Sequence, residues 1–156
     1  MATGKPLVRS IQLTPLSHDH YEGLLFVWRI RQGITKNISL KIISAFINWF
    51  WEKHLATHFN EEERYLAPHL PADDILIKKM ITDHETIREL IRRIDGNSLN
   101  DITTFATLLN DHIRFEEREL FPYIERKLTQ SELNEIRAHL DHTPSCSDKW
   151  PDEFWK

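Results

Sequence analysis

The chain has 156 residues, of which 40% are hydrophobic and 28% charged, so we expect a single soluble globular domain over residues 1–156. Its formal net charge of −4 at pH 7 argues against nucleic acid as a general partner. The only cysteine, Cys146, excludes an intrachain disulfide, a thiolate zinc finger and an iron–sulfur cluster, and the four scattered glycines exclude a phosphate-binding glycine loop.

Helical periodicity dominates the sequence. In chain order we expect an irregular lead-in over residues 1–13, helices near 15–33, 39–66, 72–94, 98–127 and 131–139, and a polar tail to residue 156. Pro15 suits the first turn of the first helix and Gly33 its C-terminal end. No segment shows the sustained alternation of a strand. The expected fold class is therefore all-α, an up-down-up-down four-helix bundle over about 14–128 with a short C-terminal helix and tail over 129–156.

Three features of the sequence bear on the cellular location of the protein. The N-terminal residues lack the long apolar core of a secretion signal. The densest apolar run, residues 45–51, is too short to cross a bilayer. Together with the single cysteine, these features favour a cytoplasmic protein with no membrane partner. The tail aromatics Trp150, Phe154 and Trp155 are expected to dock on the bundle.

An eleven-residue pattern occurs twice. Residues 58–68 and 112–122 both read His-x-x-x-Glu-Glu-Arg-x-Leu-x-Pro. Residues four apart on a helix lie one turn apart on the same side, so His58 points with Glu62, and His112 with Glu116. Helical spacing places these glutamates on apolar, core-facing stripes. Burying an unpaired carboxylate is costly, so both glutamates predict a cation in the interior.

Two further histidines complete the pattern. Asp19-His20 precedes the first copy and Asp83-His84 precedes the second. Short connections between antiparallel helices would bring all four histidines to a comparable depth, where six side chains could share one interior layer. These six are His20, His58, Glu62, His84, His112 and Glu116. Four imidazoles and two carboxylates without thiolates favour iron, manganese or zinc over copper(I), and six ligands suit two metals with glutamates able to bridge them.

The ordering of these residues resembles the hemerythrin-like, or HHE cation-binding, domain family over about residues 14–128. Two other metal-site patterns are missing, since neither the Glu-x-x-His of ferritin-like proteins nor the His-Glu-x-x-His of zincins occurs. The resemblance implies a four-helix bundle holding two non-haem iron ions, bridged by two carboxylates and usually an oxo or hydroxo group. It implies that His20, His58, His84 and His112 are terminal ligands and that Glu62 and Glu116 are the bridges.

One position departs from the oxygen-carrying members of that family. Where they place a further histidine, one turn after His84, this chain has Arg88. A cation there must turn away or pair with a carboxylate. Water or a nearby side chain could then fill the vacant ligand position. The obvious side chain is His54, one turn before His58, which also makes His54 with His58 a rival ligand pair.

Several neighbouring residues admit a simpler interpretation. Asp19 and Asp83 could orient imidazoles, but adjacent helix residues point about 100° apart, so we expect solvated surface charges. The glutamates that follow or lie near the inner pair, Glu63, Glu117 and Glu119, are expected to pair with surface arginines. The aromatic residues near the site are expected to serve in packing; they are Trp28, Phe59 and Phe115. We expect no second metal site from His139, His142 and Cys146.

Three functions remain open from the sequence. An iron pair with an open position would bind dioxygen, nitric oxide or peroxide, for sensing, storage or detoxification. The same pair could serve a di-iron oxidase or peroxidase, or donate iron for cluster repair. Alternatively, a redox-inert metal could hold together an interaction domain. The sequence contains no feature that identifies a protein partner.

Overall fold

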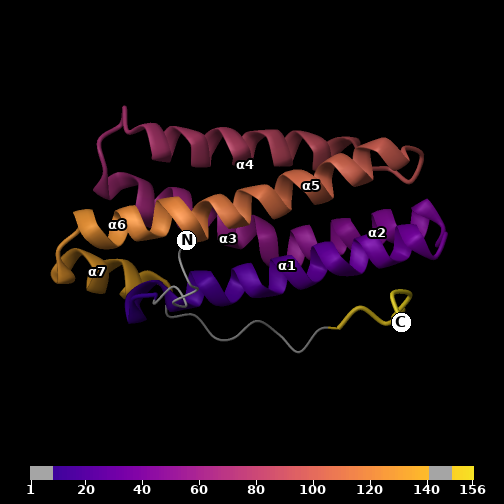
Figure 1. Ribbon diagram of the computed structural model, residues 1–156, viewed down its shortest axis with the longest axis horizontal. Coiled ribbons are helices and arrows are strands. Elements are labelled where there is room, and N and C mark those ends of the chain that lie inside the picture. The colour runs from indigo at the N-terminus through magenta and orange to yellow at the C-terminus, as the bar shows by residue number, and fades with distance from the viewer. Residues whose placement is uncertain (1–8, 141–148) are drawn as a thin grey trace, which may run out of the picture.

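The computed structural model describes residues 9–140 and 149–156, and these residues form helices and no strand. Four antiparallel rods make the body (Figure 1). They are α1 (Thr14–Thr35); α2 (Leu40–Phe50), η2 (Trp51–Leu55), α3 (Ala56–Glu61) and η3 (Glu62–Leu66); α4 (Ile75–Arg93); and α5 (Leu99–Phe115), η5 (Glu116–Leu120) and α6 (Phe121–Lys127). The short turns η1 (Ile11–Leu13) and η4 (Ala67–His69) and the final helix α7 (Gln130–Leu140) complete the described part. The expected all-α fold is confirmed.

The connections alternate between the two ends of the bundle. Figure 1 shows α1 joined to α2 and α4 joined to α5 at one end, with α3–α4 and α6–α7 joined at the other. This is the up-down-up-down order expected for short loops between neighbouring helices. None of the helices within residues 9–140 and 149–156 is long and apolar enough to span a membrane.

Capping side chains decide where the rods begin. Ser39, Asp74 and Ser98 each accept a hydrogen bond from a backbone N–H in the first turn of α2, α4 and α5. The sequence placed the third helix start near residue 72, which is too early, because Asp74 is the cap and not part of the first turn. The Tyr123 hydroxyl donates to the same Asp74 carboxylate and so ties α6 to the start of α4.

Gly33 does not end the first helix, as the sequence suggested. The helix continues to Thr35, and Asn37 takes the left-handed backbone conformation after it, with a φ of 57°. Gly33 is buried, and a Cβ there would lie 2.7 Å from Cε1 of Phe154. The absence of a side chain at Gly33 therefore makes room for the ring of Phe154, and Gly33 does not cap the helix.

The tail docks on the bundle, which confirms the expectation for its aromatic residues. Phe154 and Trp155 are 7% and 8% exposed, and the Phe46 ring centroid lies 5.2 Å and 5.4 Å from theirs. The guanidinium of Arg29 lies 4.4 Å from the Trp155 ring centroid, a cation–π contact. These contacts close one end of the hydrophobic core.

Both copies of the repeated pattern contain a π-helical turn. η3 begins at Glu62 and η5 at Glu116, and each ends two residues before a proline, Pro68 or Pro122. Proline has no N–H to donate and crowds the carbonyl of the preceding turn, and a local widening of the helix relieves both conflicts. Such turns are frequent at functional sites. The matching prolines therefore place a matching backbone distortion at each inner glutamate.

The hydrophobic core is divided into two clusters. One contains Phe26, Phe105 and most of the aromatic tail contacts, and the other contains Leu16, Met80 and Phe121. Along each rod the predicted metal ligands fall between residues of the two clusters, as His20 does between Leu16 and Phe26. A buried polar layer therefore separates two apolar regions.

Replacing Phe154 by alanine should destabilise the bundle by about 3 kcal/mol, the usual cost of deleting a buried aromatic side chain. The change removes the ring that packs against Gly33 and leaves the polar layer intact. Urea unfolding monitored by circular dichroism measures it. Ile75→Ala is the matched control, because Ile75 is 81% exposed and its truncation should alter stability by no more than about 0.5 kcal/mol. Equal effects of the two changes would contradict a docked tail.

Candidate metal centre

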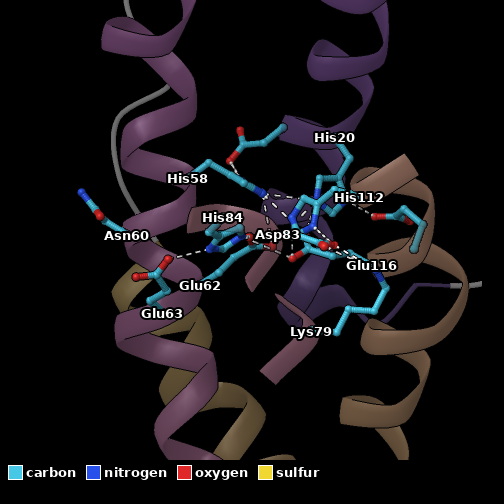
Figure 2. A network of polar contacts seen from close by, with 12 residues as sticks. His20, His58, Asn60, Glu62, Glu63, Lys79, Asp83, His84, His112 and Glu116 are labelled. Carbon is cyan, nitrogen blue, oxygen red and sulfur yellow. Dashed lines mark hydrogen bonds and ion pairs between the residues drawn. The ribbon is translucent and has the colours of Figure 1, made fainter. Parts of the chain in front are cut away.

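The structure brings all six predicted ligands into one buried layer. His20, His58 and His112 are 3%, 4% and 2% exposed, and Glu62, His84 and Glu116 are fully buried. Figure 2 shows their side chains converging from four different rods. Their donor atoms form two overlapping groups, within each of which all atoms lie within 4.8 Å of one another. One group is His20, His58, Glu62 and Glu116; the other is Glu62, His84, His112 and Glu116.

Each glutamate spans the two groups with its two oxygens. Glu62 places Oε2 3.2 Å from Nε2 of His58 and Oε1 3.0 Å from Nε2 of His84. Glu116 places Oε1 2.7 Å from Nε2 of His20 and Oε2 3.1 Å from Nε2 of His112. Each carboxylate therefore offers one oxygen to each pair of histidines. This is the arrangement that a bridging carboxylate between two metal ions requires.

Several polar atoms in this layer have no satisfactory protein partner. Oε2 of Glu62, Oε2 of Glu116 and Nε2 of His112 are buried and make no hydrogen bond. The Nε2 atoms of His20 and His58 lie 3.2 Å apart and face each other, although two neutral ring nitrogens can share only one proton. Buried polar atoms left unpaired are costly. Two cations among these atoms would satisfy all of them, so the residues fit the dimetal site that the sequence predicts.

A second set of carboxylates holds the outer side of each imidazole. The Nδ1 to carboxylate distances are 2.6 Å for His20 to Glu117, 3.0 Å for His58 to Asp19, 2.6 Å for His84 to Glu63 and 2.9 Å for His112 to Asp83. A carboxylate at Nδ1 keeps the proton on that nitrogen and leaves the Nε2 lone pair free to bind a metal. All four rings are thereby oriented with Nε2 toward the centre.

The purely surface role expected for Asp19 and Asp83 is wrong, because each holds an imidazole. Glu63 and Glu117 do pair with arginines, Arg88 and Arg9, but each also holds an imidazole. All four carboxylate side chains are 24% to 34% exposed, so they reach both solvent and the interior. A residue 100° around the helix from an inward-facing neighbour faces the adjacent rod. There it meets that rod's histidine. The signal was present in the sequence as matched Asp-His and Glu-Glu pairs. Glu119 is exposed, as expected.

Arg88 does not approach the inner layer. Its Nη1 lies 2.9 Å from Oε2 of Glu63 and its Nη2 donates to Asn60 at 3.3 Å, so the guanidinium pairs with an outer carboxylate. Arg9 plays the same part across the bundle, pairing with Glu117 at 3.2 Å and Glu125 at 2.8 Å. Arg9 was not predicted from the sequence, because it lies in the segment expected to be an irregular lead-in.

The rival ligand His54 lies away from the centre. Its ring packs against Trp49 and Phe50, with centroids 5.8 Å and 4.8 Å apart, and it belongs to neither donor group. Trp28 is 50% exposed and so does not pack as expected. His139 stacks on Tyr65. His142 and Cys146, from which together with His139 we expected no second metal site, lie outside the described residues.

The metal-free layer holds protons where cations would bind. Burial lowers the pKa of His84, but hydrogen bonds to Glu116, Glu62 and Glu63 outweigh it and raise that pKa to about 10. Burial also lowers the pKa of His112, and the charge of Glu116 and a hydrogen bond to Asp83 raise it to about 9. The carboxylates around His20 and His58 likewise raise the pKa of each imidazole against burial.

Metal ions would compete with protons at these nitrogens. Metal binding requires neutral imidazole, and the raised pKa values of His84 and His112 mean that both rings would give up a proton when a metal binds near pH 7.

A family model described as the hemerythrin HHE cation binding domain matches residues 15–124. The chain belongs to this hemerythrin family. Comparison with curated proteins and with solved structures gave no match. Family membership and the buried histidine–glutamate cluster agree that the domain binds cations.

Loading the hemerythrin domain with divalent ions near pH 7 should release protons, including those of His84 and His112, whose pKa values lie well above 7. In the metal-free protein the raised histidine pKa values stabilise the fold fully below about pH 6.5, where unfolded histidine is also protonated. That stability is lost as the pH rises toward 9 and 10, the values of His112 and His84. Metal affinity should rise over the same range. Calorimetry in buffers of different ionisation enthalpy measures the released protons, and release of none would contradict protonated rings.

Removing one outer carboxylate by Asp83→Ala should weaken metal binding by about 10- to 100-fold, because His112 loses the acceptor that orients it. Competition with a chelator of known affinity measures this change. Asp73→Ala is the matched control, because Asp73 is exposed and lies in the loop before the same helix. Equal affinities in the two variants would contradict an orienting role for Asp83.

Proposed function

We propose that this hemerythrin domain holds two iron ions at the six-residue layer. His20 and His58 would bind one ion, His84 and His112 the other, with Glu62 and Glu116 shared between them. The proposal is supported by the split of each carboxylate between two histidine pairs, a feature that a single tetrahedral zinc site does not need. A donor set of imidazole and carboxylate without thiolate suits iron and manganese as well as zinc.

Each ion would receive four protein donor atoms, two from imidazoles and two from the shared carboxylates. Iron commonly takes six ligands, so each ion retains positions for an oxo or hydroxo bridge and for an incoming small molecule. Arg88 supports this view, because the side chain at the position of a further family histidine is bound to Glu63 instead. The centre is therefore more open than a five-histidine site.

A cavity supplies a route to these positions. It has a volume of about 1260 Å³ and is lined near the centre by His20, His58 and His112. Its lining is mixed, with apolar residues such as Leu109 and Ile113 and charged residues such as Lys53. A cavity of this size that reaches three candidate ligands would admit dioxygen, nitric oxide or peroxide to the centre.

The iron pair would supply the electrons for binding or reducing such a ligand. The protein residues then do three things. The outer carboxylates orient the rings, as described above. The two apolar clusters on either side exclude bulk water from the layer. Arg88 and Arg9 hold two of the outer carboxylates, Glu63 and Glu117, ionised and in place. The pKa of Glu63 stays below its usual value, because the hydrogen bonds from His84 and Arg88 outweigh the opposing effect of burial.

We propose that the physiological role is the capture or reduction of dioxygen, nitric oxide or peroxide, and not reversible storage of oxygen. The observation that favours reduction is the absence of a further histidine at position 88, so that the ion on the His84 side, like the other ion, would have only two imidazole ligands. Open coordination positions would let peroxide bind directly to iron and react further. The competing possibility is that the domain holds only a redox-inert metal, and the experiment below distinguishes the two.

The Glu62→Ala and Glu116→Ala variants should each lose at least one of two irons and unfold at a lower temperature, since metal binding contributes to folding. Metal analysis and the absorption spectrum of protein purified without added metal measure this. Glu119→Ala, an exposed glutamate of the same motif, should keep both ions, and His54→Ala should be milder than His58→Ala. A full metal content in both inner variants, or native protein holding only zinc and inert to peroxide, would overturn the proposal.

A further inference from the structure

We propose that Trp51 carries oxidising equivalents from the metal layer to the protein surface through the ring of Phe59, an inference that rests on the proposed function above. Trp51 is partly exposed in η2 and packs against the hydrophobic core. Its ring centroid lies 5.5 Å from that of Phe59, with the two rings nearly perpendicular at 76°. Phe59 is 1% exposed.

The buried ring of Phe59 joins Trp51 to two of the candidate ligands. Phe59 stacks on His84 with a centroid distance of 3.9 Å and an interplanar angle of 8°, and its centroid lies 5.6 Å from that of His112. The guanidinium of Arg88 lies 5.8 Å from the same ring on the outer side. Three packed rings therefore connect the surface with the polar layer. Electron tunnelling decays steeply with distance and is faster through packed atoms than through gaps, so this contact is an efficient path.

The other tryptophans lack such a connection. All five lie within the described residues. The rings of Trp49, Trp150 and Trp155 contact one another or nearby aromatic rings such as Phe46, Phe50 and His54, none of which is a candidate ligand. Trp28 is the most exposed tryptophan, at 50%, and among the described residues its ring contacts no ring of the polar layer. If solvent exposure decided which tryptophan is oxidised, it would be Trp28. If contact with the metal layer decided it, it would be Trp51.

The two electrons that peroxide takes come from two donors. Hydrogen peroxide takes two electrons and two protons to give two water molecules. Where bound iron has only one electron to give, the indole of Trp51 would supply the second. The indole radical cation gives its N–H proton to water. A thiol in solution then returns one electron and one proton to Trp51, and two of the resulting thiyl radicals join as a disulfide.

Phe59 itself is not oxidised in this scheme. A phenyl ring is far harder to oxidise than an indole, so the electron passes from Trp51 to the layer in one tunnelling event. The benefit is protection of the buried rings. Without a donor, the leftover oxidising equivalent would remain beside His84, His112 and Phe59, which are 0% to 2% exposed.

The experiment uses iron-loaded protein prepared with one reducing electron per centre and mixed with hydrogen peroxide. Rapid freezing and electron paramagnetic resonance should show a tryptophan radical, which ring-deuterated tryptophan identifies. Peptide mapping without thiol should place most oxidised tryptophan at residue 51. Trp51→Phe should abolish the radical while the iron is oxidised as before, and Trp49→Phe and Trp28→Phe should retain it. Phe59→Leu, in protein checked for full iron content, should slow radical formation.

The outcomes separate the two proposals. Iron that peroxide does not oxidise overturns the proposed function and the relay with it. Iron that is oxidised without a tryptophan radical in the native chain overturns the relay alone. A radical that persists in Trp51→Phe, or oxidation that follows exposure and falls mainly on Trp28, also overturns the relay.

Discussion

A closed ring of hydrogen bonds between rods is the constraint on which this structure depends. Each rod supplies one inward histidine and one carboxylate for the histidine of a neighbour. In order around the ring, Asp19 of α1 holds His58, Glu63 of η3 holds His84, Asp83 of α4 holds His112, and Glu117 of η5 holds His20. Sliding any rod along its axis would break two of these bonds. The same contacts therefore set both the depth of the rods and the aim of the candidate ligands.

The ring also explains how so many ionisable groups tolerate burial. Charges alternate in sign outward from the centre, from inner carboxylate to imidazole to outer carboxylate to a surface cation such as Arg88, Arg9 or Lys79. The outer side of each imidazole is thereby paired, which lowers the desolvation cost of the layer, while the inner atoms that make no hydrogen bond are those that metal ions would satisfy. The two hydrophobic clusters can then close over the layer from either end.

The sequence was sufficient to predict the fold and the inner layer because both depend on local periodicity. Helical spacing placed His58 with Glu62 and His112 with Glu116 on apolar faces, and the structure puts these residues together. The outer carboxylates were misassigned because their role depends on which rod lies beside them, and helix geometry alone does not contain that information. Arg9 could not be found for the same reason, since its partners Glu117 and Glu125 are more than one hundred positions away in the chain. Gly33 was misread because the side chain it accommodates comes from the distant C-terminal tail.

The layer is nearly symmetric in its ligands but not in its surroundings, and this asymmetry divides its two sides. His20, His58, His112 and Phe59 line the cavity, whereas His84 is not among its lining residues. His84 is fully buried and stacks on the flat face of Phe59, with Trp51 on from that ring. Phe59 therefore belongs both to the cavity lining and to the path proposed for electrons. The two ion sites proposed for the duplicated motif would differ in their access to small molecules, because only one of the four histidines does not line the cavity.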